Sequence, residues 1–186
     1  DFVGQDVINS RKIKDIYNLE YTEIVIPNDI EQLKIDVRFI IEKFKVKKKT
    51  QVQCIYPFLY MVDHIKEDVV LCGVCADTLY GSSRKMSELG RKDDVAFYEK
   101  RKALHELPET ASYSFTRDIF VEKGKVFVAP YKENKDLANF LLSKTYKELH
   151  SPKEKNIAYE YYKDEIEKHK LYRRKSSMQC DSKIRE

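Results

Sequence analysis

The sequence predicts an α/β protein in which helices cover both faces of a parallel, Rossmann-like sheet, giving three αβα layers. Two observations support this prediction. Short apolar segments alternate with helical patterns in the first half of the chain, which is typical of βαβ units. The run "DVVLCG" at 68–73 is almost continuously apolar, as expected of a buried parallel strand. We expect one domain over 1–186, with an α/β half at 1–84 and a mainly helical half at 85–186.

Composition sets limits on the class of protein. The chain has 186 residues, of which 42% are hydrophobic and 35% charged, so it can build a core and is not expected to be disordered. No apolar run approaches the roughly 18–20 residues that span a bilayer. The four cysteines have no spacing typical of a disulfide framework, so we expect a reducing, cytoplasmic setting. They are Cys54, Cys72, Cys75 and Cys180.

The N-terminal segment supplies the first elements of the predicted sheet. "DFVG" reads as the end of a strand, and Asp6 can cap a helix that continues to about Tyr17. "YTEIVIP", at 21–27, predicts a short strand closed by proline. The chain opens without a methionine on what reads as a strand end, so we expect the natural N-terminus to lie upstream.

Two helices are predicted before the central strand. Asp29 can cap the first, in which apolar residues recur at helical spacing. These residues are Ile30, Leu33, Val37, Ile40, Ile41 and Phe44. After the basic loop "KVKKKTQ", an apolar face predicts a helix from about Val52 to Ile65, with Pro57 tolerated only near its start.

The second half reads differently. "SSRKMSELGRKDD", at 82–94, reads as a polar linker, and "KVFVAPY", at 125–131, as a short extended segment. Four segments between and after these have helical patterns. They are Asp94–Leu104, Glu109–Val121, Lys135–Ser143 and Pro152–Glu167.

The loop after the central strand is the first candidate site. In open parallel sheets, ligands bind beyond the carboxyl ends of the strands. Gly73 permits close approach of a ligand, and Asp77 projects a carboxylate from the next helix. A carboxylate beside polyphosphate indicates Mg²⁺, which binds one or two carboxylates plus phosphate oxygens. Two alternatives stay open: an ordinary acid at a helix start, and thiol chemistry by Cys72 and Cys75.

The excess of positive charge lies near the C-terminus. Residues 144–186 contain twelve Lys or Arg against eight Asp or Glu, an excess equal to the net charge of +4 for the whole chain. Such a segment attracts phosphate, either in nucleotides or in nucleic acid, or forms a solvated helical face. Nothing in it reads as a nucleic-acid-binding module with interleaved aromatic residues.

Several segments, in order along nearly the whole chain, resemble the C-terminal domain of asparagine synthetases. "VVLCGVCADTLYGSS" is similar to the loop G-E-G-x-D-E-x-F-G-G that follows an apolar strand in that family. The other similar segments are "YTEIVIP", "QCIYPFLYMVDHIKE", "VFVAPYKENKDLANFLL" and "EKNIAYEYYKDEIEKHKLYRRKSSMQ". The resemblance implies an ATP-pyrophosphatase of the adenine nucleotide α-hydrolase-like fold.

The resemblance also implies a reaction and its residues. Members of the family use a substrate carboxylate to attack the α-phosphate of ATP, and then transfer the acyl group of the adenylate to an amine. Asp77 would bind Mg²⁺ on the pyrophosphate, while Lys175, helped by Arg173, would neutralise charge on the phosphates. Lys155 is a weaker candidate for that task. The nucleotide would contact Val3, Gly4, Cys72, Gly73 and Val74.

Three departures from the family keep other functions open. The family's SGGxDS loop is absent and would precede Asp1, Val74 replaces a glutamate, and no glutaminase domain is present. The expectation is therefore an AMP-forming, amide-forming ligase that uses ATP, Mg²⁺, a carboxylate substrate and an amine donor. The alternatives are a non-catalytic relative that binds a nucleotide or partner, and a thiol-redox protein. Homo-oligomer formation also stays open.

Overall fold

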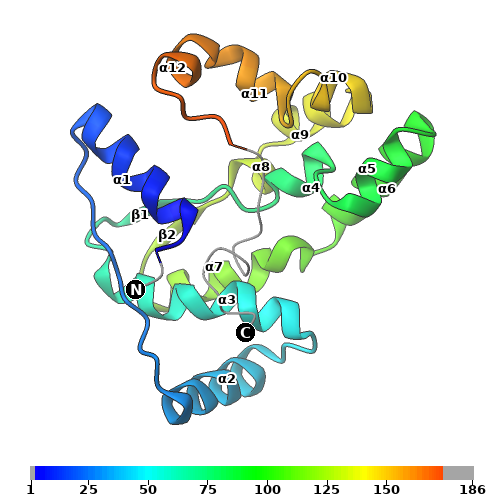
Figure 1. Ribbon diagram of the computed structural model, residues 1–186. Helices are drawn as coiled ribbons and strands as arrows, with labels where there is room; N and C mark the ends of the chain where they lie inside the picture. The colour runs from blue at the N-terminus through cyan, green and yellow to red at the C-terminus, as the bar shows by residue number, and fades with distance from the viewer. Residues whose placement is uncertain (1–2, 174–186) are drawn as a thin grey trace. The chain divides into compact units, whose positions relative to one another are not determined.

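The computed structural model describes residues 3–173, whose helices and strands are drawn in Figure 1. These residues divide into two compact units, 3–66 and 67–173. Of the described residues, 65% are helical and 4% form strands. The predicted three-layer αβα architecture with a Rossmann-like sheet is therefore wrong for this part of the chain, which is mainly helical.

The first unit consists of helices. They are α1 (Gln5–Tyr17), α2 (Ile30–Phe44), α3 (Lys49–Met61) and the short 3₁₀-helix η1 (Val62–His64). As predicted, Asp29 caps α2: its carboxylate accepts hydrogen bonds from the backbone N–H groups of Glu31 and Gln32 at 2.8 and 3.2 Å. Helix α3 begins earlier than predicted, so Pro57 lies in its interior, where it cannot donate to the carbonyl of Gln53.

The strand predicted at 21–27 does not form. This segment has no regular secondary structure and no partner strand, and the side chain of Val25 is 87% exposed. A bidentate ion pair connects this segment to α1: Arg11 of α1 donates to the carboxylate of Glu23 at 2.5 and 2.6 Å. The β-propensity of these residues was therefore not enough to form a strand, because no neighbouring strand in the described part of the chain pairs with them.

The second unit contains the two strands and most of the short helices. In chain order they are β1 (Val69–Leu71), α4 (Ala76–Tyr80), α5 (Arg84–Gly90), α6 (Asp94–Glu106), η2 (Thr110–Ser112), α7 (Tyr113–Glu122), β2 (Val126–Val128), α8 (Pro130–Glu133), α9 (Lys135–Leu142), α10 (Tyr146–His150), α11 (Asn156–Tyr161) and α12 (Lys163–Lys168). No helix within residues 3–173 is long and apolar enough to cross a membrane.

Strands β1 and β2 pair in parallel, with Val70 opposite Phe127. Both lie where the sequence predicts extended segments. Phe127 is buried, but Val69 and Leu71 are 57% and 73% exposed, so β1 is not buried on both faces as predicted. The crossover between the strands contains α4 to α7, as a parallel connection requires.

Two helical predictions need correction. The predicted linker at 82–94 contains α5, because Ser83 caps it by accepting a hydrogen bond from the backbone N–H of Met86, which is buried in the core. The helix predicted at 152–167 is instead two short helices, α11 and α12, which are separated at Tyr162. Helices α6 and α9 begin where predicted.

The core of the second unit gathers apolar side chains from α4, α5, α6, α9 and α10. Its buried members are Leu79, Tyr80, Met86, Phe97, Ala138, Leu141, Leu142 and Leu149. Inside this core lies a charged residue, Arg101 of α6, which has no exposed surface. The stem of Arg101 fits the apolar surroundings, whereas its guanidinium requires hydrogen-bond acceptors.

Four backbone carbonyls accept hydrogen bonds from the two Nη groups of this guanidinium, whereas its Nε is buried without a hydrogen-bond partner among the described residues. Nη1 donates to Leu79 and Leu141 at 2.7 and 2.9 Å, and Nη2 donates to Leu142 and Lys144 at 3.0 and 2.7 Å. These carbonyls belong to the last turns of α4 and α9 and to the segment after α9, where a helix leaves carbonyls unpaired. A cation is also favoured there by the helix dipoles.

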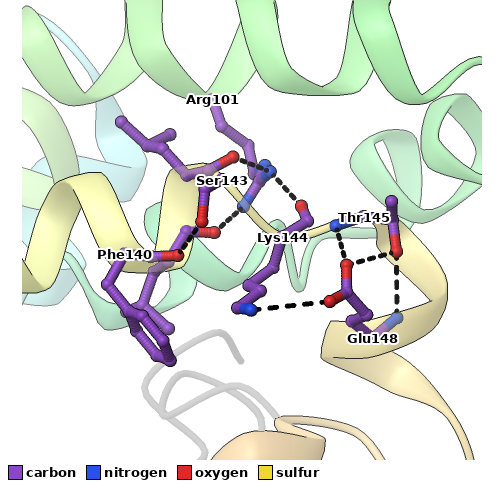
Figure 2. Close-up of polar contacts among 8 residues, drawn as sticks. Arg101, Phe140, Ser143, Lys144, Thr145 and Glu148 are labelled. Atoms are coloured by element: carbon purple, nitrogen blue, oxygen red, sulfur yellow. Dashed lines mark hydrogen bonds and ion pairs between the residues drawn. The ribbon is translucent and has the colours of Figure 1, made fainter.

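The contacts continue into the next helix, as Figure 2 shows. Thr145 and Glu148 form a capping box at the start of α10, in which the backbone N–H of Thr145 donates to the Glu148 carboxylate at 2.8 Å. Lys144, whose carbonyl Arg101 holds, also lies 3.5 Å from that carboxylate through its own ammonium. Arg101 thus fixes the end of α9, and the capping box starts α10 directly after it.

Replacing Arg101 with methionine should destabilise the protein strongly. Arg101→Met keeps an apolar stem of similar length but removes four hydrogen bonds to backbone carbonyls, of which that of Leu141 still accepts from the backbone N–H of Lys144 at 3.2 Å, so we expect a loss of at least about 3 kcal/mol in the free energy of unfolding. Urea unfolding followed by far-UV circular dichroism measures this loss. Lys100→Met, on the exposed face of the same helix, should change it by no more than about 0.5 kcal/mol. Equal effects of the two variants would refute this function of Arg101.

Candidate functional site

The candidate site begins at the carboxyl end of β1. The backbone N–H of Cys72 donates to the carbonyl of Val128 at 2.9 Å, which extends the parallel pairing one residue beyond the strand. The chain then turns through Gly73 and Val74 into α4. A Cβ built on Gly73 would meet no atom within 4 Å, so the space beside this glycine is open. The loop therefore leaves room for a ligand close to its backbone.

Three non-glycine residues around this loop have left-handed backbone conformations. Cys75, at the start of α4, has φ 73°, and the consecutive residues Ala111 and Ser112 have φ 48° and 63°. Cys75 and Thr110 lie together, because the Cys75 thiol is 3.7 Å from the Thr110 carbonyl and the hydroxyls of Thr78 and Thr110 are 3.5 Å apart. Such conformations are costly for residues with side chains and concentrate at functional sites.

The two thiols of the CxxC sequence are poor nucleophiles. Both cysteines are free. Burial raises the pKa of the Cys72 thiol, and it raises that of Cys75 to about 11 even though the positive charge of Lys132 acts in the opposite direction. Both groups are therefore protonated at neutral pH, whereas redox and metal-binding cysteines need the thiolate. The geometry does not favour the thiol-redox alternative.

Asp77 and Lys155 form an ion pair. The Lys155 ammonium lies 3.0 Å from the carboxylate of Asp77, and the two side chains are 39% and 50% exposed. Lys155 also lies over the ring of Tyr80, 6.0 Å from its centroid. Since Asp77 begins α4 and Lys155 precedes α11, the fold brings together charges that are 78 positions apart. A half-exposed pair of this kind adds little stability and can exchange partners with a charged ligand.

The carboxyl end of β2 carries a second set of polar groups. Glu133 of α8 accepts hydrogen bonds from the backbone N–H of Ala129 at 3.0 Å and from the Tyr113 hydroxyl at 2.6 Å. Lys132 donates to the carbonyls of His105 and Leu107. These contacts fix the segment after β2, but they also occupy Lys132 and Glu133. The Asp77–Lys155 pair, by contrast, takes no part in these contacts.

The other predicted site residues are distributed over the chain. Val3 and Gly4 belong to the first unit, where Val3 is 39% exposed and Gly4 is buried. Arg173 is half-buried in the segment after α12. Lys175 lies outside the described residues. Only Cys72, Gly73 and Val74 adjoin the Asp77 segment directly in sequence.

The donor set restricts which metals this part of the chain can bind. Residues 3–173 contain no cluster of three or more His, Cys, Asp or Glu side chains that could hold a metal ion. A single half-exposed carboxylate such as Asp77 does not make a protein-only metal site. It does fit Mg²⁺ that is bound mainly by phosphate oxygens, since such ions keep only one or two carboxylate ligands.

Comparisons with protein-family models, curated proteins and solved structures find no match to this chain.

Two residues that organise the site are absent from the candidates that the sequence predicted. Arg101 lies in the charged run "EKRKALHE", which reads as a solvated helix surface. The helical spacing could have identified Arg101 as a buried residue, because Phe97, Arg101 and Leu104 lie at i, i+4 and i+7 on one helix face. Thr110 had no such signal, since its contacts depend on tertiary structure.

Gly81, which ends α4, should not tolerate a side chain. Its φ of 65° disfavours alanine, and an added Cβ would lie 2.4 Å from Cε2 of Phe97. Gly124 provides a matched control, because its φ is 74° but nothing lies within 4 Å of an added Cβ. We expect Gly124→Ala to lower the free energy of unfolding in urea by about 1 kcal/mol. Gly81→Ala should lower it by about 2 kcal/mol more through overpacking. Equal losses would mean that α4 does not pack on Phe97 in this way.

Proposed function

We propose that the chain is part of an ATP-dependent, AMP-forming ligase of the asparagine synthetase type, which adenylates a carboxylate and transfers it to an amine. The observation that carries the proposal is the Asp77–Lys155 pair, a carboxylate and an ammonium 3.0 Å apart. The pair adjoins the open loop at the carboxyl end of β1, the edge at which parallel strands bind ligands. The proposal rests on this site and on the sequence resemblance.

The reaction would proceed in two steps. A carboxylate oxygen of the substrate bonds to the α-phosphorus of ATP while the bond from that phosphorus to the pyrophosphate oxygen breaks. The amine then attacks the acyl carbon, AMP leaves, and the amine loses a proton. Bound Mg²⁺ would neutralise charge on the triphosphate and so favour release of pyrophosphate.

The residues of the chain would bind and orient ATP. Asp77 would hold Mg²⁺ through one carboxylate, and Lys155, released from that carboxylate, would contact a phosphate oxygen. The backbone of Cys72, Gly73 and Val74 would line the nucleotide, because the space beside Gly73 is open. The resemblance adds Arg173 of the same unit as a further cation for the phosphates.

A second candidate function is a relative of these ligases that binds a nucleotide or partner without catalysis. The specific observation is that the loop lacks a group that could accept a proton from an amine. Valine at position 74 has no such group, and the raised pKa values of Cys72 and Cys75 keep both thiols protonated. For the ligase reaction, the amine would have to come from an external ammonia source, or a base elsewhere would have to accept the proton of the amine.

ATP–pyrophosphate exchange tests the proposal on a full-length protein with Mg²⁺ and a panel of carboxylates that includes aspartate. We expect exchange with at least one carboxylate. Asp77→Asn should lower the rate about 100-fold, and Lys155→Ala about 10- to 100-fold, because each removes charge stabilisation at the phosphates. Lys153→Ala is the matched control: its ammonium lies over the ring of Tyr172 at 4.6 Å rather than beside Asp77, and exchange should stay within twofold of wild type.

The outcomes separate the two candidate functions. Exchange by the wild type with undiminished exchange by Asp77→Asn would refute the role of Asp77. Binding of ATP in equilibrium dialysis without exchange for any carboxylate would favour the non-catalytic relative. If the protein neither bound ATP nor catalysed the exchange, both candidate functions would be refuted.

A further inference from the structure

A hollow of about 440 Å³ lies within the first unit, on the surface shared by α2 and α3. Leu33, Val37 and Ile41 of α2 line it together with Val52 and Tyr56 of α3 and Val46 between the helices. The α2 residues follow the i, i+4, i+8 pattern, and the two α3 residues are four positions apart, so each helix presents one apolar stripe. Its volume is in the range of small-molecule sites, about 300–1,000 Å³.

The hollow leaves apolar surface in contact with water. Leu33 and Ile41 are 40% and 44% exposed, whereas neighbouring residues such as Ile40 and Ile55 are fully buried in the core of the unit. Covering these side chains would be favourable in proportion to the apolar area removed from water, about 25 cal/mol per Å². A ligand with an apolar chain or ring would supply that cover.

Charge at the hollow has a single sign. Lys47, Lys48 and Lys49 line it, and no acidic side chain does. All three lysines are exposed. Within the described part of the chain, no hydrogen bond or ion pair engages their side chains. Val46 is 5% exposed and anchors the start of this run in the core, so the lysines follow directly from a fixed position. This arrangement favours an anionic group at the edge of the hollow.

We propose that this hollow binds a small amphiphile with one apolar chain and one anionic head group, such as a medium-chain carboxylate. The chain would lie between the stripes of α2 and α3, with the head group against Lys47–Lys49. The volume of the hollow is in the range of a small molecule, and the lysines complement a carboxylate. This site consists only of first-unit residues and is independent of the proposed ligase function.

Calorimetric titration of the full-length protein with sodium decanoate, below its micellar concentration, tests the proposal. We expect one decanoate per chain and no binding of decyltrimethylammonium, which has the same chain but a cationic head. The triple variant Lys47→Glu, Lys48→Glu, Lys49→Glu should bind decanoate at least about tenfold more weakly, because three attractive contacts become repulsive. The control Lys12→Glu, Lys14→Glu, Lys66→Glu changes the net charge equally at lysines that do not line the hollow and should stay within about twofold of wild type.

Methyl NMR of the wild type locates the ligand even if a variant fails to fold. Decanoate should shift the methyl signals of Val37, Val46 and Val52, and leave those of Val121 and Val126 in the second unit unchanged. Equal weakening by the two triple variants would mean general charge attraction and would overturn the proposal. So would equal binding of the cationic amphiphile, absence of decanoate binding, or shifts at Val121 and Val126 as large as those at the hollow.

Discussion

The second unit depends on one buried cation. The Arg101 guanidinium has no described carboxylate in an ion pair with it and instead donates to four backbone carbonyls. Burial lowers its pKa to about 10, so it stays charged at neutral pH, and it lies 4.2 Å from the ring centroid of Phe97. An uncompensated buried charge would be costly, but these carbonyls lie at or just after helix ends and carry partial negative charge. The arginine thereby joins α4, α6 and α9 through hydrogen bonds with fixed directions.

The same contacts position the candidate site. Arg101 holds the carbonyl of Leu79, two residues after Asp77 in α4, and His150 Nε2 lies 2.6 Å from the carbonyl of the next residue, Tyr80. Helix α10 begins at the capping box that follows the Arg101 contacts, and the chain then leads to Lys155, which precedes α11 and meets Asp77. Changes at Arg101 should therefore affect the geometry of the Asp77–Lys155 pair as well as stability.

Local patterns predicted individual elements better than the architecture. The cap at Asp29, the starts of α6 and α9 and the two strand positions followed from capping residues and periodicity, which act within a few residues. The three-layer sheet was wrong because a strand needs a partner, and the apolar segment at 21–27 has none. At the site, sequence indicated Asp77 and, more weakly, Lys155 as separate candidates. Their contact, the burial of Arg101 and the left-handed residues near Thr110 depend on tertiary packing, which the sequence pattern does not specify.

The most direct test of this account is ¹⁵N-edited NMR of the arginine side chains in the full-length protein. Arg84, whose side chain is 92% exposed, provides an internal comparison. If four carbonyls hold the Arg101 guanidinium in the core, its Nη protons should give separate signals and exchange with water far more slowly than those of Arg84. A single averaged Arg101 signal that exchanges as fast as that of Arg84 would contradict the account, because the helix ends would then lack the cation on which their packing depends.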